Sequence, residues 1–477
     1  MELEKDLKSR QQVRELVTAA ARAQEKIRTF DQQAIDRIVE AMAQTAFAHA
    51  EELARLAVEE TGFGNVPDKT RKNQFASRTL WEAIREQRTV GILGKDPKSR
   101  TWDVGVPVGV IAGIAPSTNP TSTVIYKAMI ALKGGNTIVL SPHPGAKNCS
   151  CRTAELLMEA AKNAGCPDGA IGCISIPTME AVDELMKHPQ VKLILATGGG
   201  AMVRSAYSSG KPAIGVGAGN GPAYFHPSCE LGQAVADVVQ SKTFDNGVIC
   251  ASEQSIILER ANEKEALAEL QRQGCCILSE EDGKKLAGRL FRSNGTIDPK
   301  IVGKTAGEIA KKAGLSPQAQ QAKVLIAREN GVGKNFPYSM EKLCPVLGLY
   351  VVDDQQEALR LSCEILHHEG SGHTFVLHAR NEAVIRQFAM EVPVSRFLVN
   401  TPASLGGIGA TTGLFPALTL GCGAVGGSSS SNNIGPLDLI NIRRVAWGHR
   451  AQETAHTTTT DDELLERLTQ KLLEKLR

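Results

Sequence analysis

The fold class follows from "VPVGVIAGIAPSTNPTSTVIYKAMIALKGGNTIVLSPHP", which runs from Val106 to Pro144. An apolar segment rich in valine and isoleucine (106–116) predicts a strand, and a helical segment (121–135) follows it and ends in two glycines. The next apolar segment (136–144) predicts a second strand. Strand, helix and strand in this order are typical of a parallel sheet that is covered by helices.

The same alternation continues toward the C-terminus. The pattern predicts, in chain order, a helix over 145–165, a strand over 169–177, a helix over 178–189, a strand over 191–200, a helix over 201–210 and a strand over 211–219. A second α/β region begins after about residue 220. We therefore expect an α/β protein whose first parallel sheet carries helices on both faces.

The segments that flank this region differ from it. The first ~90 residues are predicted to be helical, and the segment 31–64 repeats apolar residues at helical spacing until Gly62 and Gly64 end it. Near the other end, "LDLINIRRVAWG" (437–448) alternates apolar and polar residues like an edge strand. We expect it to pair with "RTWDVGVPVGV" (100–110) or with another subunit.

The last residues form a separate unit. A polar linker (451–460) precedes an amphipathic helix (461–477). Six leucines form one stripe on that helix: Leu464, Leu465, Leu468, Leu472, Leu473 and Leu476. A helix this short is marginal alone, so it should dock either within the protein or its oligomer, or on a partner as a targeting helix.

Composition limits the functional classes. The chain has 477 residues, 42% of them hydrophobic and 22% charged, as expected for a soluble globular protein of two or three domains. A formal net charge of +2 gives no electrostatic reason to expect nucleic acid or a membrane surface as a partner. The N-terminal "MELEKDLKSRQQV" has no apolar core, and no apolar run approaches the ~20 residues that span a bilayer. We expect a cytoplasmic protein.

The cysteines predict neither disulfides nor a metal site. There are 11 of them, without regular spacing, which is typical of reduced thiols. Cys149 and Cys151 are too close for a CxxC motif, and His367 and His368 are adjacent rather than one helical turn apart. Cys250, in "SKTFDNGVICASEQ" (241–254), is either a small buried filler or a nucleophile beside a flexible glycine.

Several motifs together resemble one family. "APSTNPTSTVIYKAMIALKGGNTIVLSPHPGAKN", "FDNGVICASEQ" and "EKLCPVLGLY" occur in the order seen in the aldehyde dehydrogenase superfamily, and they are most similar to the branch that acylates coenzyme A (CoA). The resemblance spans roughly residues 10 to 450. It implies an aldehyde dehydrogenase-like α/β fold: a Rossmann-type cofactor domain (1–225, without about 95–110), an α/β catalytic domain (226–430) and a small β oligomerisation element (95–110 and 431–450).

The resemblance assigns the catalytic residues. Cys250 matches the family's nucleophile, whose thiolate attacks the aldehyde carbonyl and forms a thiohemiacetal oxyanion. The backbone N–H of that cysteine and the side-chain amide of Asn119 are implied as oxyanion donors. Asn119 could otherwise be an ordinary turn residue beside a proline.

The resemblance also implies a site for NAD. Glu341 matches the glutamate that holds the nicotinamide ribose, although it could be a solvated surface carboxylate. Thr197 and the turn glycines Gly198, Gly199 and Gly200 would place the pyrophosphate near a helix N-terminus. Further cofactor contacts are implied at Pro116, Ser117, Thr118, Ser141, His143 and Pro144. His143 and Pro144 stand where hydrolytic relatives usually carry a lysine, so NAD is expected but NADP stays open.

The acyl acceptor is indicated by an absence. Hydrolytic members activate water with a glutamate in an E-L-G-G-K-like segment, whereas the matching "IGVGAGNGPAYF" contains no carboxylate between Ile214 and Phe225. Without that base, CoA is the expected acceptor, entering the nucleotide slot after NADH leaves. His373, in a "GHT" segment of acylating enzymes, is a candidate base for the thiols, and otherwise a structural histidine.

We therefore expect an enzyme that reversibly oxidises acetaldehyde or propanal with NAD and CoA to acyl-CoA. A non-acylating dehydrogenase or an acyl-phosphate reductase on the same fold is the first alternative, and a non-catalytic scaffold associated with a protein shell is the second. The resemblance implies a homodimer or homotetramer. It also suggests a location inside a bacterial microcompartment, with the helix 461–477 contacting a shell protein.

Overall fold

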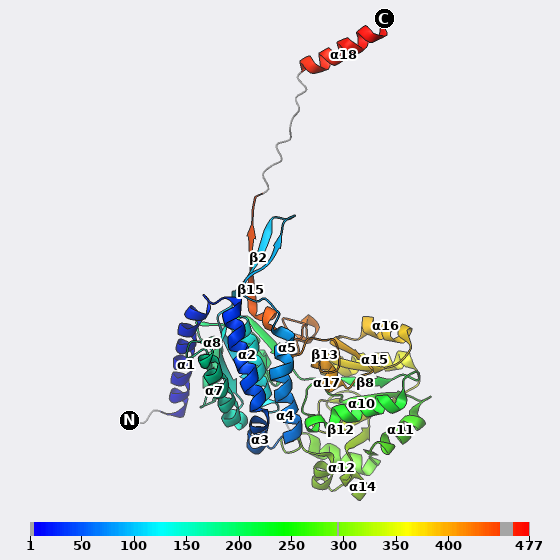
Figure 1. Ribbon diagram of the computed structural model, residues 1–477. Coiled ribbons are helices and arrows are strands. Elements are labelled where there is room, and N and C mark those ends of the chain that lie inside the picture. The colour runs from blue at the N-terminus through cyan, green and yellow to red at the C-terminus, as the bar shows by residue number, and fades with distance from the viewer. Residues whose placement is uncertain (1–3, 293–294, 449–460, 477) are drawn as a thin grey trace.

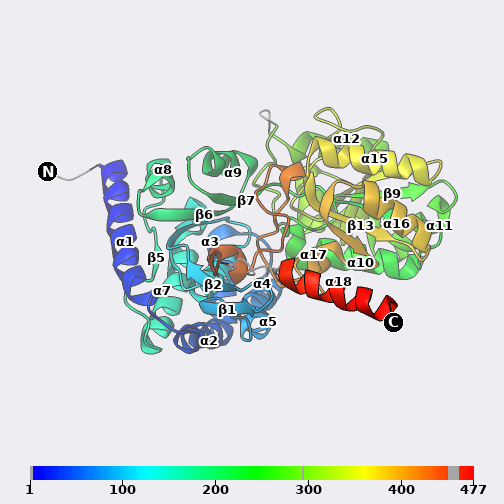
Figure 2. The ribbon, with the colours of Figure 1, turned by 90° about the horizontal axis from the view of Figure 1, so that it is seen from above.

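Three β-sheets organise the chain into two lobes and a projecting arm (Figure 1). The computed structural model describes residues 4–292, 295–448 and 461–476. Seen from above, the lobe that contains the N-terminal half of the chain lies beside the lobe built from the residues that follow (Figure 2). In the described parts of the chain, no helix is long and apolar enough to cross a membrane.

The N-terminal lobe is built on a five-stranded parallel sheet with the strand order β5-β4-β3-β6-β7. Its strands are β3 (Val110–Ala115), β4 (Thr137–Pro142), β5 (Ile171–Cys173), β6 (Val191–Thr197) and β7 (Ala213–Val216). Its helices are α1 (Lys5–Ile27), α2 (Gln32–Ala48), α3 (Ala50–Thr61), α4 (Val66–Gln74), α5 (Leu80–Ile84), α6 (Pro120–Lys133), α7 (Lys147–Asn163), α8 (Met179–Lys187) and α9 (Gly200–Tyr207).

Helices cover both faces of this sheet, as predicted. Along β6, Leu193 and Leu195 join an apolar cluster with residues of α2, α6 and α7, whereas Ile194 and Ala196 join a cluster with α1 and α8. This alternation is the two-residue period of a strand that is buried on both sides. Helix α6 is buried along its whole length, and its two buried lysines, Lys127 and Lys133, find oxygen partners for their ammonium groups.

The second lobe is built on a seven-stranded parallel sheet with the order β10-β11-β12-β9-β8-β13-β14. Its strands are β8 (Pro222–Phe225), β9 (Ser255–Glu259), β10 (Cys275–Ile277), β11 (Val324–Arg328), β12 (Val346–Val352), β13 (Gly372–His378) and β14 (Val394–Val399). Its helices are α10 (Leu231–Thr243), α11 (Glu263–Arg272), α12 (Glu280–Leu290), α13 (Ala306–Ala313), α14 (Pro317–Gln320), α15 (Gln355–His368), α16 (Glu382–Glu391) and α17 (Ala403–Gly407).

The arm is a three-stranded antiparallel sheet that projects from the N-terminal lobe (Figure 1). It consists of β1 (Gly91–Asp96), β2 (Thr101–Pro107) and β15 (Ile440–Ala446). Strand β15 pairs with β2 from Ile440 opposite Pro107 to Ala446 opposite Thr101, so the predicted pairing of these two segments is present. The side chain of Ile442 on this arm is 53% exposed.

The structure differs from the sequence predictions at three boundaries. The helical segment 31–64 is two helices, because His49 leaves the helical conformation between α2 and α3. The predicted strand 106–116 is divided between β2 and β3, because Gly109 with φ 120° turns the chain from the arm into the lobe. Strand β8 pairs with β9 and β13, so the second lobe begins soon after residue 220, where the strand pattern places it, and not at the boundary of 225 that the resemblance implies.

The chain then returns to the N-terminal lobe. Ile408, Leu420 and Ile434 belong to the same apolar cluster as α6, and the Tyr126 hydroxyl of α6 donates to the Ile434 carbonyl. The predicted domain 226–430 therefore ends with residues that cover the first sheet rather than the second. The predicted linker 451–460 lies outside the described residues.

The C-terminal segment forms the predicted helix, α18 (Asp461–Lys475). Its leucines are exposed, from 52% at Leu464 to 80% at Leu476. Within the part of the chain that the structure describes, the apolar stripe therefore has no cover, and docking within one subunit is not observed.

Candidate active site

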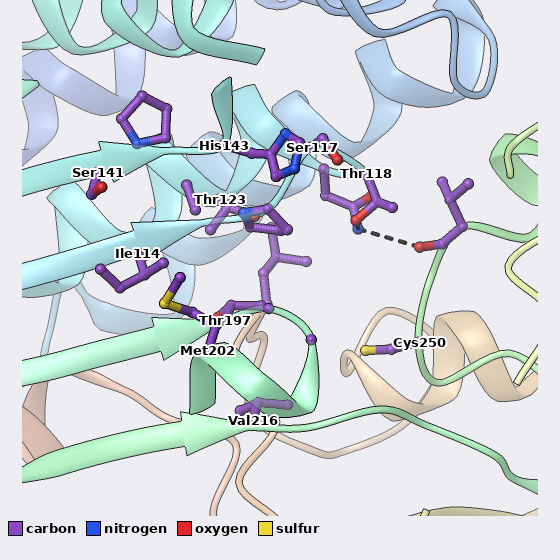
Figure 3. Close-up of a pocket in the computed structure, with 18 of the residues that line it drawn as sticks. Ile114, Ser117, Thr118, Thr123, Ser141, His143, Thr197, Met202, Val216 and Cys250 are labelled. Carbon is purple, nitrogen blue, oxygen red and sulfur yellow. Dashed lines mark hydrogen bonds between the residues drawn. The ribbon is translucent and has the colours of Figure 1, made fainter. Parts of the chain in front are cut away.

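A cavity of about 600 Å³ begins at the carboxyl ends of β3, β4, β6 and β7 and extends to Cys250 (Figure 3). This edge is where parallel α/β sheets generally bind ligands. The cavity brings together most of the residues that the sequence assigned to the site: Pro116, Ser117, Thr118, Asn119, Ser141, His143, Pro144, Thr197, Gly198, Gly199, Cys250 and Glu341. Gly200 and His373 are not among its lining residues.

The sheet end of the cavity (Ser141, His143, Thr197, Gly198 and Gly199) is neutral and open. Among the residues that the structure describes, the buried Ser141 hydroxyl finds no hydrogen-bond partner, which leaves it available to a ligand. A Cβ added to Gly199 would meet no protein atom within 4 Å, so this turn leaves space at the N-terminus of α9. Burial lowers the pKa of His143, and its Nδ1 accepts a hydrogen bond from Gly145 N at 3.1 Å. These features fit the phosphates and ribose of a nucleotide cofactor.

The cysteine end of the cavity (Lys72, Asn119, Cys250 and Glu341) begins with a sharp turn after α10. Asp245, Asn246 and Gly247 have φ values of 48°, 54° and 75°, three consecutive residues in the left-handed region. A Cβ on Gly247 would lie 3.0 Å from the main chain of Cys344, so glycine is needed both for its conformation and for its close packing. This turn presents Cys250 across the cavity from the strand ends (Figure 3).

The Cys250 thiol is half-buried, and its raised pKa keeps it protonated at neutral pH. Burial, followed by the Glu341 carboxylate and Cys422, raises its pKa to about 12, and the Arg396 guanidinium opposes the rise. The backbone N–H of Cys250 also lies against the sulfur and lowers the pKa. A reactive thiolate therefore requires a change in this environment when ligands bind.

Asn119 is the N-cap residue of α6 and faces the Cys250 loop. Its Nδ2 lies 3.4 Å from the Val248 carbonyl and 3.3 Å from the Thr118 hydroxyl, and its Oδ1 accepts a hydrogen bond from Lys72 Nζ. The side-chain N–H groups of Asn119 therefore point toward the segment that carries Cys250. This geometry is suited to donation to an oxyanion formed at that cysteine.

Glu341 joins the cysteine end from the segment before β12. Its Oε1 accepts a hydrogen bond from Gly219 N at 2.9 Å, and burial, followed by the nearby Glu369, raises its pKa to about 8. Among the described residues that line the cavity, Glu341 supplies the sole carboxylate.

His373 is fully buried and does not line the cavity. A Cβ on Gly219 would lie 1.9 Å from the Cys250 carbonyl oxygen and 3.2 Å from His373 Cε1, so the ring lies near the Cys250 main chain. Burial and the Arg396 cation lower the pKa of His373 to about 3. In this setting the ring is a weaker proton acceptor than an unperturbed histidine with a pKa near ~6.5, and the role of His373 as a base stays a prediction.

The segment that replaces the hydrolytic motif contributes uncharged side chains. Between Ile214 and Phe225, the residues Val216, Gly217 and Ala218 line the cavity. Among the described residues, no group of three or more His, Cys, Asp or Glu side chains could hold a metal ion, and all eleven cysteines are free.

Two sets of site residues were missed by sequence reasoning. Lys72 of α4 lines the cavity although its side chain is only 2% exposed, and Leu418 and Leu420 enter it from the returning C-terminal segment. Lys72 belongs to a polar stretch, "VPDKTRKNQ", that gives no local signal for burial. The leucines become site residues only because the chain crosses back to the first lobe.

Comparison with known proteins agrees with this geometry. Residues 4–274 match the aldehyde dehydrogenase family. The bifunctional aldehyde-alcohol dehydrogenase of Escherichia coli K12 is 42% identical over 436 residues, which are 90% of this chain but 49% of that protein. The chain thus spans about half the length of the first of its curated relatives.

Other relatives match over nearly their full length. Succinate-semialdehyde dehydrogenase (acetylating) of Clostridium kluyveri is 36% identical over 91% of this chain and 95% of its own. The crystal structure of an acetylating aldehyde dehydrogenase from Geobacillus thermoglucosidasius superposes with a TM-score of 0.92 at 48% identity, covering 94% of this chain and 99% of that one. With its cysteine, asparagine and glutamate gathered in one cavity at the sheet edge, the chain belongs to the aldehyde dehydrogenase family.

Proposed function

We propose that the protein oxidises a short aliphatic aldehyde, acetaldehyde or propanal, with NAD and CoA to the acyl-CoA, and that the reaction is reversible. The observation that carries this proposal is the set Val216, Gly217 and Ala218, which lines the cavity where a hydrolytic enzyme needs a carboxylate. With no base from that segment, water is poorly activated and a thiol acceptor is favoured.

The chain's own residues account for the first step. The Cys250 thiolate sulfur bonds to the carbonyl carbon while the π electrons of the carbonyl move onto its oxygen. The Asn119 amide faces this region and donates a hydrogen bond to the resulting oxyanion. The nicotinamide cofactor supplies a hydride acceptor when it is bound.

The residues of the sheet end support nucleotide binding. The free Ser141 hydroxyl and the open turn at Gly199 suit a phosphate-bearing ligand. A lysine for a 2′-phosphate is absent from the described lining of this end, and we therefore assign NAD as the preferred cofactor. CoA enters the same space and accepts the acyl group. A solved propionaldehyde dehydrogenase of Rhodopseudomonas palustris, 26% identical with a TM-score of 0.82, has bound CoA and an acylated cysteine.

The test of this proposal is the dependence of NADH formation on CoA. Acetaldehyde, propanal and butanal are each supplied with and without CoA, and the products are identified. Acyl-CoA as the product, together with a rate of NADH formation that falls by more than about 100-fold when CoA is left out, supports the proposal. Free acid formed equally fast without CoA overturns it and points to Glu341, the carboxylate that lies in the cavity, as a base for water.

The same assay separates the alternatives. An acyl-phosphate reductase on this fold replaces CoA with inorganic phosphate as acceptor, and a scaffold protein shows no turnover with any acceptor. The gathering of Cys250, Asn119 and Glu341 in one cavity favours an enzyme over a scaffold.

The arm supports assembly into a homodimer or homotetramer. Its outer strands expose Ile92 and Ile442 at 38% and 53%, and the exposed backbone edges of β1 and β15 are able to pair with another copy. Sedimentation of the wild type and of a variant lacking residues 91–104 measures this directly. A monomeric wild type would contradict it.

The helix α18 supports a location inside a bacterial microcompartment, with a shell protein covering its exposed leucines. A solved propionaldehyde dehydrogenase from Clostridium phytofermentans, 28% identical with a TM-score of 0.82, belongs to a fucose utilisation microcompartment. Residues 451–477 are fused to a fluorescent protein and expressed with shell proteins. Punctate fluorescence that Leu465→Glu and Leu472→Glu abolish supports targeting, and diffuse fluorescence of the unsubstituted fusion overturns it.

A further inference from the structure

A buried cluster of charges lies directly behind the cysteine end of the cavity. Lys69 and Lys72 are both 2% exposed, one helical turn apart on α4, and both ammonium groups contact Asp245 Oδ2, at 3.0 Å for Lys69. The carboxylate of Asp245 is itself fully buried. The backbone N–H of Asp245 donates to Asp68 Oδ2 at 2.8 Å, and Asp68 also lies 3.6 Å from an Arg71 guanidinium nitrogen.

The cluster carries more positive than negative charge. Two buried ammonium groups, those of Lys69 and Lys72, share the single buried carboxylate of Asp245, whereas Arg71, whose side chain is 71% exposed, pairs with Asp68 at the edge of the cluster. A buried cation that is only partly neutralised is costly, because the ammonium loses its hydration. Burial accordingly lowers the pKa of Lys72 to about 8, and Asp245 opposes that shift. Such an arrangement is unfavourable for stability alone and suggests a functional use.

The backbone at Asp245 and the space around its carboxylate are both unusual. Asp245 adopts a left-handed conformation with φ 48°, which is disfavoured for a residue with a side chain. A Cβ on Gly64 would lie 1.8 Å from Asp245 Oδ1, so a glycine at that position makes room for the carboxylate. Asp245 Oδ1 accepts a hydrogen bond from Asn65 N at 2.9 Å.

The two lysines reach different atoms of the loop before α6. Lys69 Nζ donates to the Thr118 main-chain oxygen at 2.9 Å, whereas Lys72 Nζ donates to the side-chain oxygen of Asn119. An ammonium group only donates hydrogen bonds, so it accepts one orientation of an amide, with the oxygen toward it and the nitrogen away. We propose that Lys72 is a positioning residue that fixes the Asn119 amide with its N–H groups facing the reacting carbonyl oxygen.

The orientation of the Asn119 amide matters for the reaction because its nitrogen donates a hydrogen bond whereas its oxygen only accepts one. With Lys72 in place, the nitrogen of Asn119 faces the Val248 carbonyl and the cavity, where the oxyanion forms. Without Lys72, only the long contacts of the nitrogen with the Val248 carbonyl at 3.4 Å and the Thr118 hydroxyl at 3.3 Å favour this orientation, and an amide that rotates by half a turn presents its oxygen, which repels an oxyanion. The inference rests on the proposed role of Asn119, and it concerns the oxyanion step, which precedes transfer of the acyl group to any acceptor.

A double-mutant cycle tests the inference. The wild type, Lys72→Met, Asn119→Ala and the double variant are compared for kcat at saturating aldehyde, nucleotide and CoA. In the wild-type background, Lys72→Met is expected to lower kcat on the order of 100-fold, as for loss of an oxyanion donor. In the Asn119→Ala background the same substitution should lower kcat by less than about 3-fold, because the effects of coupled residues are not additive. An equal loss in both backgrounds overturns the proposal.

Lys69→Met is the matched control. It removes the same charge from the same buried carboxylate but leaves the Asn119 contact in place. We expect its kcat to stay within about 5-fold of the wild type, since it removes no oxyanion donor. A loss equal to that of Lys72→Met would show that charge, rather than orientation, is responsible. With a 1-deuterated aldehyde, Lys72→Met should also shrink the kinetic isotope effect, because the slowed oxyanion-forming step breaks no C–H bond, whereas a purely structural defect would leave the isotope effect unchanged.

A second substitution covers the case in which Lys72→Met does not fold. Lys72→Gln offers both a donor and an acceptor, so it no longer dictates the orientation of the neighbouring amide. We expect a loss of about 10-fold in kcat that disappears in the Asn119→Ala background. No loss with Lys72→Gln overturns the proposal. If the wild type oxidises aldehydes without CoA, the proposed function fails, but this cycle still reports on Lys72.

Discussion

The two ends of the cavity are built from different kinds of residue. The sheet end consists of neutral groups such as Ser141, Thr197 and Gly199, with an open turn at the start of α9. The cysteine end is surrounded by buried ionisable groups, among them Lys72, whose cation is backed by Asp245, and Glu341. The difference indicates that one end provides shape for a ligand, whereas the other provides charge and hydrogen bonds for a reaction.

The largest expected effect is at Cys250. Cys250→Ala removes the nucleophile and should lower kcat by at least ~10⁴-fold, while nucleotide affinity, measured by fluorescence quenching, changes little because the sheet end is intact. Cys422→Ala, which removes a neighbouring buried thiol, is the control and should keep kcat within about 10-fold. Activity that survives in Cys250→Ala would mean that the reaction does not depend on the cysteine end of the cavity.

The next effect is at the sheet end. Gly199 has φ −63° and a Cβ there would meet no protein atom within 4 Å, so Gly199→Leu should fold normally but fill the space for a ligand. The KM for the nucleotide should rise by about 10- to 100-fold with a much smaller change in kcat, as for loss of uniform binding. Gly283→Leu, at another open glycine in α12, is the control. A fall in kcat with an unchanged KM for the nucleotide would show that the turn at Gly199 contributes to the reaction step rather than to nucleotide binding.

The contrast between the two ends also explains what the sequence could predict. The sheet end lies in contiguous strand–turn segments, so its residues and the parallel sheet were predictable from local pattern and resemblance. The cysteine end depends on contacts between distant segments: Lys72 meets Asp245 across 173 positions. A polar stretch in α4 carries no local sign that its lysine is buried. The low pKa of His373 likewise depends on burial and on Arg396, which lie outside its own segment.

A smaller effect is expected where the two ends meet, at Val216. Val216→Glu adds a carboxylate to the part of the cavity lined by uncharged residues. An imperfectly placed base should raise free-acid formation without CoA by about 10-fold, below the 10²- to 10⁴-fold of a well-placed one. Val216→Gln, of similar size without the charge, is the control. Equal acid formation by both variants would show that the missing carboxylate does not determine the acyl acceptor.

The smallest effect is expected at His373, which is buried near the Cys250 main chain without lining the cavity. His373→Asn should change kcat by less than about 10-fold, and its pH–rate profile between pH 5 and 8 should parallel that of the wild type, because burial lowers the pKa of His373 to about 3. If the wild-type rate changes with pH near pH 6.5 and His373→Asn removes that change, the ring acts as a proton acceptor once ligands are bound.

The lowered pKa of His373 also predicts how the stability of the folded protein depends on pH. Above pH ~6.5 His373 is neutral in both the folded and unfolded states and contributes nothing. As the pH falls below ~6.5, the unfolded chain takes up a proton that the folded protein, with a pKa of about 3, does not accept, so the folded state loses stability. The loss is about 1.4 kcal/mol per pH unit for one group. Thermal unfolding of His373→Asn should therefore be less sensitive to acid between pH 6.5 and 5 than that of the wild type, and equal sensitivity would place the ring in a more solvated setting than the structure shows.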